Sequence, residues 1–157
     1  MNIREARLPA DEPAILSFIA GLQDYESAFE PDRRRDPDFV VDHWRELQHR
    51  CAENHGVFLI AEEAGKPVGW AFAHDTPGHL FVVEPERRHG SLAELYVMPD
   101  VRSQGHGRAL IAACEDWARG RGHKLLTVGV LTKNARALRS YEGAGFAPYT
   151  SVMRRYL

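Results

Sequence analysis

A pair of glycines between an apolar run and a helix-forming run is the feature that most limits how this chain can fold. Gly105 and Gly107 lie in VRSQGHGRAL (101–110), after LAELYVM (92–98) and before ALIAACEDWARG (109–120). This order predicts a strand, a tight loop and the start of a helix. The first N–H groups of a helix have no partner within it, and the helix dipole places about half a positive charge there. The segment therefore predicts an anion-binding loop, with phosphate as the best-matched anion.

The two common nucleotide-binding motifs do not fit this loop. The dinucleotide fingerprint requires glycine or alanine where Leu110 stands, and an acidic residue about 20 residues further on, where the chain has Lys124. The P-loop requires Gly-Lys-Ser/Thr, whereas Arg108 follows the second glycine. The pattern that remains is R-x-x-G-x-G, beginning at Arg102.

Length and composition indicate a single domain, residues 1–157, that is large enough to bury a core. The 20 Lys and Arg are balanced by 22 Asp and Glu, and the net charge is −2, which argues against a nucleic-acid partner. The chain has no apolar run of the roughly 18 residues needed to span a membrane. Its two cysteines have no Cys-x-x-Cys spacing, and its N-terminus is charged, so we expect a cytoplasmic protein.

Hydrophobic periodicity predicts alternating strands and helices along the chain. We expect a first strand at 2–8, helices at 12–23 and about 38–54, a hairpin at 57–61 and 68–73, a central strand at 91–98, a helix after the glycine pair, a strand at 124–131, a helix at 134–142 and a last strand at 151–157. The apolar segment 80–83 either lengthens a strand or forms a flap. This order, βααβββαβαβ, predicts an α/β fold with a mixed sheet.

Several histidines raise the question of a metal site. His74, His79 and His89 lie in one region, and Cys51 and His55 have helical i, i+4 spacing. A metal site needs three or four convergent ligands, and none of these spacings matches a metal signature. We therefore predict no metal.

The residues around the glycine pair resemble the GCN5-related N-acetyltransferase (GNAT) family, whose acetyl-CoA loop follows the pattern Q/R-x-x-G-x-G/A. The segment ELYVMPDVRSQGHGRALI (94–111) is similar to the family's fourth strand and third helix, and NARALRSYEGAGF (134–146) to a later Asn…Tyr…Gly-Phe segment. The resemblance covers roughly the second half of the chain. It implies a mostly antiparallel sheet of about six or seven strands with about four helices, splayed between the fourth and fifth strands.

The resemblance implies acetyl-CoA as co-substrate and assigns residues to it. The loop would hold the diphosphate through backbone N–H groups, with added charge from its arginines; it comprises Arg102, Ser103, Gln104, Gly105, His106, Gly107 and Arg108. The strand end Leu95, Tyr96 and Val97 would bind the pantetheine arm and donate an N–H to the thioester carbonyl. Such a donor contributes roughly 3 to 4 kcal/mol to the transition state. A tight turn with no ligand is the simpler alternative for the loop.

Asn134 and Tyr141 are the next candidates. They are seven residues apart, two helical turns, so their side chains share a face. The resemblance implies that Asn134 contacts the cofactor and that Tyr141 protonates the departing sulfur. A phenol suits this role because its pKa of about 10 keeps it protonated at neutral pH. The alternative is a buried tyrosine bonded to a backbone carbonyl.

The acceptor amine must be neutral to attack, which costs roughly 4 to 5 kcal/mol for a lysine-like amine at pH 7. Glu94 interrupts an apolar strand and is our candidate base, although an exposed position or a buried ion pair explains it equally well. Tyr25, Glu26 and Glu30 are candidates for binding the acceptor, because the resemblance places their region over the acceptor site. The three arginines at 33–35 form either a solvated turn or a part of the substrate-binding site.

These residues predict an acetyl-CoA-dependent N-acetyltransferase that acts on a primary amine of a small molecule or peptide by direct attack. Two alternatives stay open. One is an acyltransferase that uses another acyl-CoA or an O-acceptor, and the other is a non-catalytic domain that binds CoA as a sensor. Dimerisation is common in the family, so the resemblance extends to a homodimer of unspecified geometry.

Overall fold

Five strands form one mixed sheet in the computed structural model, which describes residues 1–157. Their order is β1 (Asn2–Glu5), β2 (Val57–Glu63), β3 (Lys66–Thr76), β4 (His89–Val97) and β5 (Leu126–Val128). The helices are α1 (Glu12–Ser27), α2 (Phe39–Glu53), α3 (Glu84–Arg87), α4 (His106–Gly120) and α5 (Ala135–Gly143), with a 3-10 turn, η1 (Pro99–Val101), before α4. Neighbouring strands are antiparallel from β1 to β4, and β4 pairs with β5 in parallel. None of the helices is both long and apolar enough to cross a membrane.

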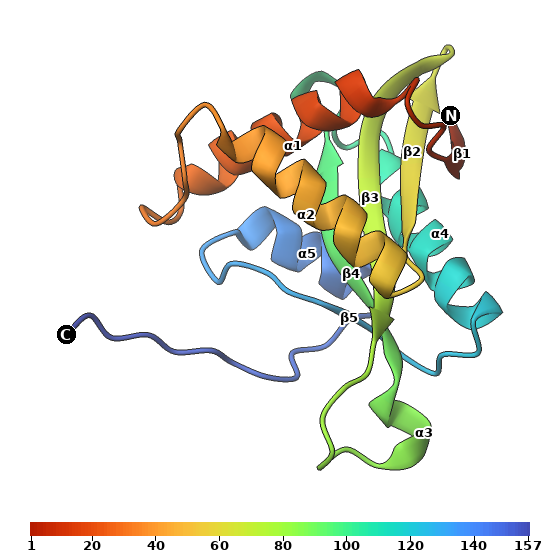
Figure 1. Ribbon diagram of the computed structural model, residues 1–157, viewed down its shortest axis with the longest axis vertical. Coiled ribbons are helices and arrows are strands. Elements are labelled where there is room, and N and C mark those ends of the chain that lie inside the picture. The colour runs from red at the N-terminus through yellow and green to blue at the C-terminus, as the bar shows by residue number, and fades with distance from the viewer.

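Helices cover both faces of the sheet (Figure 1). In β2 the side chains alternate between two cores: Leu59 belongs to the core shared with α4 and α5, and Ile60 to the core shared with α1 and α2. Both residues are almost inaccessible to solvent. The hairpin strands therefore read as continuous apolar runs, because a sheet covered on both faces buries every position. Cys114 of α4 lies fully buried in the first core.

The pairing of β4 with β5 is short, and β4 has a bulge just after the last residue that pairs with β5. Only residues 90–92 of β4 pair with β5, and the remainder of β4 has no partner on that side. On its other side, Phe72 of β3 faces Glu94 while Ala73 faces Leu92, so Ala93 is an extra residue. A bulge of this kind bends its strand and re-aims the side chains around it. The expected divergence of these two strands is thus present.

Two expectations about the edges of the sheet need correction. The sheet has five strands, not six or seven, because residues 151–157, expected as a last strand, form no strand. Their side chains are exposed, and Arg154 pairs with Asp32 and Glu30 instead. A short alternating pattern becomes a strand only where a sheet edge accepts it, and the three-residue β5 offers few backbone partners. For the segment 80–83, the structure excludes the alternative of a longer strand: the segment belongs to the excursion carrying α3, which projects from the sheet in Figure 1.

Candidate active site

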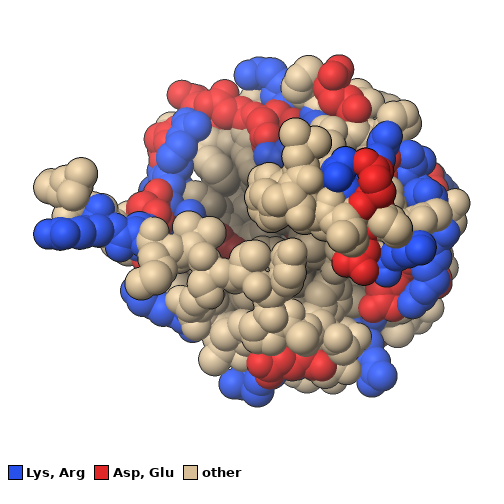
Figure 2. Space-filling model, turned by 90° about the horizontal axis from the view of Figure 1, so that it is seen from below, with Lys and Arg blue, Asp and Glu red and all other residues tan.

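The divergence of β4 and β5 opens a cavity of about 1020 Å³. Its walls come from the end of α1, the loop that follows it, α2, the second half of β4, the start of α4, the chain after β5, and α5. The surface is hollowed on the face seen from below, with charged side chains along one rim and mostly uncharged walls (Figure 2). The cavity thus joins segments far apart in sequence.

The glycine loop forms one end of the cavity. Gly105 precedes α4 with φ of +94°, and Ser103 also adopts a left-handed conformation, with φ of +65°. No side chain caps the first turn of α4, so its N–H groups remain available, as an anion-binding helix start requires. At Gly107 an added Cβ would meet only a Val97 methyl, at 3.9 Å, so a ligand can approach the backbone closely.

The residues of this loop do not all face the cavity. Arg102, Ser103, Gly105, His106, Gly107 and Arg108 line it, whereas Gln104 does not; its side chain donates to the Asp100 carbonyl. The His106 imidazole is buried, with both ring nitrogens unpartnered and Nε2 3.7 Å from a Glu63 oxygen. Backbone groups therefore dominate what the loop offers an anion.

Two arginines hold different places around the loop. Arg102 is part of the wall: its Nε donates to the Val97 carbonyl at 2.8 Å, and its guanidinium lies over the rings of Tyr25 and Tyr96. Arg136, which the sequence analysis missed, extends from α5, and its Nη2 lies 3.5 Å from Ser103 Oγ. Its signal in the sequence was the i, i+3 spacing to Arg139, which places two cations on one helix face lining the cavity.

The end of β4 presents an unpaired backbone edge to the cavity. Leu95, Tyr96 and Val97 all line it. Their side chains pack in the two cores of the protein. Those of Leu95 and Val97 lie in the core with α4, and that of Tyr96 packs against Phe18 of α1. An extended ligand can pair with such an edge as an additional strand would.

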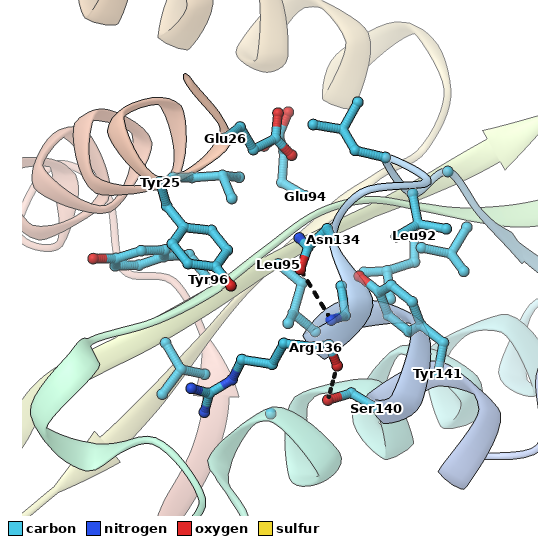
Figure 3. A pocket seen from close by; sticks show the side chains of 18 of the residues that line it. Tyr25, Glu26, Leu92, Glu94, Leu95, Tyr96, Asn134, Arg136, Ser140 and Tyr141 are labelled. Carbon is cyan, nitrogen blue, oxygen red and sulfur yellow. Dashed lines mark hydrogen bonds between the residues drawn. The ribbon is translucent and has the colours of Figure 1, made fainter. Parts of the chain in front are cut away.

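Tyr141 of α5 and Asn134, the residue before α5, lie on the opposite wall (Figure 3). Asn134 caps the helix, because its Oδ1 accepts from the Ala137 N–H at 3.1 Å, and its Nδ2 has no protein partner. Tyr141 packs edge-on against Phe146, and its hydroxyl also makes no protein hydrogen bond. Burial raises the pKa of Tyr141 to about 12, so the phenol stays protonated at neutral pH. The alternative of a tyrosine bonded to a backbone carbonyl is not what the structure has.

Two carboxylates converge at the other end of the cavity. Because Ala93 is an extra residue in β4, Glu94 faces α1 and α2, where its Oε1 lies 2.9 Å from His43 Nε2. Glu26 approaches from α1, and Figure 3 shows the two carboxylates close together. Burial raises the pKa of Glu26, the nearby Arg33 guanidinium opposes that rise, and the negative charge of Glu94 adds to it. This end of the cavity therefore favours a cation.

Of the three residues predicted to bind the acceptor, two line the cavity and one does not. Tyr25 and Glu26 line the cavity, and Tyr25 presents its ring to Arg102. Glu30 is not part of the lining and instead pairs with Lys133, at 3.3 Å, and with Arg154. His43 was missed, since a histidine on an amphipathic helix gives no sequence signal until its helix is placed over Glu94.

Comparison with known proteins identifies the family of the chain. Residues 19–146 match the model of the acetyltransferase (GNAT) family. An uncharacterized N-acetyltransferase of Bacillus subtilis, YhfO, is 36% identical over 107 residues, 68% of this chain and 69% of its own length. The aminoglycoside N(6')-acetyltransferase type 1 of Klebsiella aerogenes is 39% identical over 109 residues, 68% of each chain.

The fold also matches solved structures. The structure of AAC(6')-Iy in complex with the bisubstrate analogue CoA-S-monomethyl-acetylneamine superimposes with a TM-score of 0.68 over 99% of this chain and 97% of that one. At 17% sequence identity this similarity concerns the fold.

Proposed function

Because the chain belongs to the acetyltransferase (GNAT) family, we propose that it moves the acetyl group of acetyl-CoA to a primary amine of a small molecule or peptide by direct attack. The observation that carries this proposal is the cavity between the diverging strands, which has an anion-binding loop at one end and two carboxylates at the other. A phosphate-bearing donor and a cationic acceptor would meet in the middle, beside the free edge of β4.

The residues present fit acetyl-CoA. The uncapped start of α4 and the cavity-lining Arg108 and Arg136 suit its phosphates. The unpaired edge at 95–97 suits the amide-bearing arm. The free Nδ2 of Asn134 is a further donor along the same track. When bound, acetyl-CoA supplies the thioester whose acyl group is transferred.

The protein's own groups divide the proton transfers between them. Glu94 accepts a proton from the acceptor amine. Its carboxylate borders the end of the cavity proposed for the acceptor, and it belongs to β4, the strand whose free edge would bind acetyl-CoA. The Tyr141 hydroxyl gives a proton to the departing sulfur from the opposite wall. An N–H of the free β4 edge hydrogen-bonds the thioester carbonyl and stabilises its developing charge.

The two carboxylates favour a positively charged acceptor. Glu26 and Glu94 reach the cavity from different elements, and Arg33 balances only part of their charge, through Glu26. The relative from Klebsiella aerogenes is named for aminoglycosides, which are polyamines. We infer that the acceptor carries a second cationic group besides the amine that is acetylated.

The test is a thiol-release assay with acetyl-CoA against aminoglycosides, polyamines, amino acids and short peptides. We expect turnover with polycationic amines, and a fall in kcat of roughly 100-fold in Glu94→Gln, an isosteric change that removes the base. Glu30→Gln is the matched control, because that carboxylate lies outside the cavity, and its rate should equal the wild type.

The same assay separates the alternatives. Faster turnover with propionyl-CoA or succinyl-CoA than with acetyl-CoA would show that the protein prefers another acyl group. Ester products would indicate that the acceptor is a hydroxyl group. Tight binding of acetyl-CoA without thiol release across the whole panel would refute the proposed transfer in favour of a CoA sensor.

A further inference from the structure

Each transfer leaves one proton that must reach the solvent. A cationic amine loses two protons when it becomes an amide: one ends on the CoA thiol and the other has to leave the protein. If Glu94 takes that second proton, it must lose it before the next turnover. The Glu94 side chain is only 15% exposed, and on its cavity side the product would occupy the way out.

His43 lies on the side of Glu94 away from the cavity's cofactor end. It projects from α2, and its Nε2 is 2.9 Å from Glu94 Oε1. The ring stacks on Phe39, with centroids 5.3 Å apart and planes 16° from parallel, which holds the imidazole in place. The side chain is 24% exposed, so it bridges a buried carboxylate and the surface.

The second ring nitrogen points toward an outlet. His43 Nδ1 lies 3.7 Å from Glu46 Oε2, and the Glu46 side chain is 47% exposed. Glu94, His43 and Glu46 thus form a line of proton-transfer groups in which exposure increases at each step. An imidazole suits the middle position because it accepts a proton at one nitrogen and releases one from the other.

We propose that His43 is a relay that carries the proton taken up by Glu94 to Glu46 and the solvent. This relay rests on the proposed function and consists of two proton transfers. The protonated Glu94 gives its proton to His43 Nε2, and the resulting imidazolium releases the proton on Nδ1 to Glu46 or water. This leaves the proton of His43 on Nε2, which donates to the ionised Glu94, and once Glu94 is protonated again, exchange of the ring proton with solvent moves it to Nδ1 and frees Nε2 for the next transfer. No proton is gained or lost besides the one that the acceptor amine supplies.

The charges around His43 support this direction of transfer. Glu94 of β4 and Glu46 of α2 face its two nitrogens, and Glu26 of α1 and Arg33 stand behind Glu94. The carboxylates stabilise the transient imidazolium, while the Arg33 cation is already held by Glu26. His43 lines the same end of the cavity as Glu94, and the relay requires it to act on the amine only through Glu94.

Three variants of α2 test the relay in the thiol-release assay. In His43→Ala we expect kcat to fall about tenfold with little change in KM, and free imidazole at millimolar concentration to restore it. His43→Gln keeps a hydrogen-bond donor beside Glu94 but cannot pass a proton on, so it should be as slow as the alanine variant and insensitive to imidazole. His49→Gln, on the exposed face of the same helix, is the control and should be unchanged.

The outcomes separate the relay from the proposed function. Wild-type kcat in His43→Gln would show that His43 only positions Glu94, and wild-type kcat in His43→Ala would show that the proton leaves by another route; either result overturns the relay alone. Absence of turnover in the wild-type protein with every amine would overturn the relay together with the proposed function. Thermal melting of each variant distinguishes loss of the relay from loss of the fold.

Discussion

The two ends of the β4–β5 pair are built in opposite ways. At one end the strands are hydrogen-bonded and the buried charges around them have protein partners. At the other end the strands separate, and polar groups of β4, α4 and α5 border a cavity without protein partners, although Glu94 and Glu26 there are paired with His43 and Arg33. The contrast identifies which buried polar groups maintain the structure and which remain available to a ligand.

The closed end is held by Asp75 of β3. Its carboxylate accepts two hydrogen bonds from Arg121, at 2.7 and 2.6 Å, and lies 2.8 Å from His123 Nε2. Beside it, Gly90 lets α4 and β5 approach β4, since an added Cβ would lie 2.9 Å from Leu126. Every charge in this cluster is paired, so it has little capacity left for a ligand.

At the open end the pairing is incomplete. The Tyr141 hydroxyl and Asn134 Nδ2 have no protein partner, and the first turn of α4 has no capping side chain. These groups face the cavity, where no protein atom bonds them, so they remain available to a ligand. Substitutions at the two ends should therefore have different effects, on ligand binding and catalysis at the open end and on stability at the closed end.

Gly107→Trp should abolish acetyl-CoA binding at the open end. The space in front of Gly107 is free, so an indole would fill the site of the anion without disturbing the fold. We expect an affinity loss of 100-fold or more, about 2.7 kcal/mol, measured by calorimetry. Gly105 is a poorer choice, because its φ of +94° adds backbone strain of roughly 1 to 2 kcal/mol in any other residue.

Gly120→Trp is the matched control, since Gly120 ends α4 away from the cavity and has free space around it. Binding of acetyl-CoA should be unaffected in that variant. Undiminished affinity in Gly107→Trp itself would remove the loop from the cofactor site.

Tyr141→Phe should lower kcat by roughly 100-fold and leave the affinity for acetyl-CoA nearly unchanged, because only the proton donor is lost. Burial keeps the pKa of Tyr141 near 12, so its proton is present throughout the neutral range. The wild-type rate should accordingly show no decline due to Tyr141 below about pH 11. Wild-type turnover in the variant would mean that water or another group protonates the sulfur.

Asp75→Asn should leave catalysis intact and destabilise the closed end by about 2 to 3 kcal/mol in denaturant unfolding, since Arg121 and His123 lose a buried anion. Asp116→Asn, which removes an exposed pair with Arg119, should cost less than about 1 kcal/mol. Equal effects of the two changes would contradict a structural role for Asp75.

The pH dependence follows from the same cluster. Burial alone would raise the pKa of Asp75, but the hydrogen bonds from Arg121 and His123 outweigh it and lower the pKa from 3.8 to about 2. The folded state therefore holds the carboxylate charged below the pKa of the unfolded chain. This stabilisation is complete above about pH 5 and is lost as the pH falls through 3.8 toward 2. The Asp75→Asn variant should lack this dependence.

Much of the fold was predictable because local patterns are strong. The helices at 12–23 and 38–54 are confirmed as α1 and α2, and the hairpin at 57–61 and 68–73 as β2 and β3. The last strand was predicted wrongly, because pairing at a sheet edge depends on a neighbour that local alternation does not reveal. The start of α4 could be placed because glycine at a positive φ marks the end of a loop.

Local patterns in the sequence predicted the alternating strands and helices, the glycine loop before α4, and the helix that carries Tyr141 and begins at Asn134. These depend on periodicity and on backbone preferences, which act over a few residues. The orientation of Glu94 toward α2, the place of His43 beside it, and the position of Glu30 outside the cavity became visible in the folded chain alone. Those facts depend on a bulge at Ala93 and on helices packed against distant strands, and neither is encoded within a single short segment.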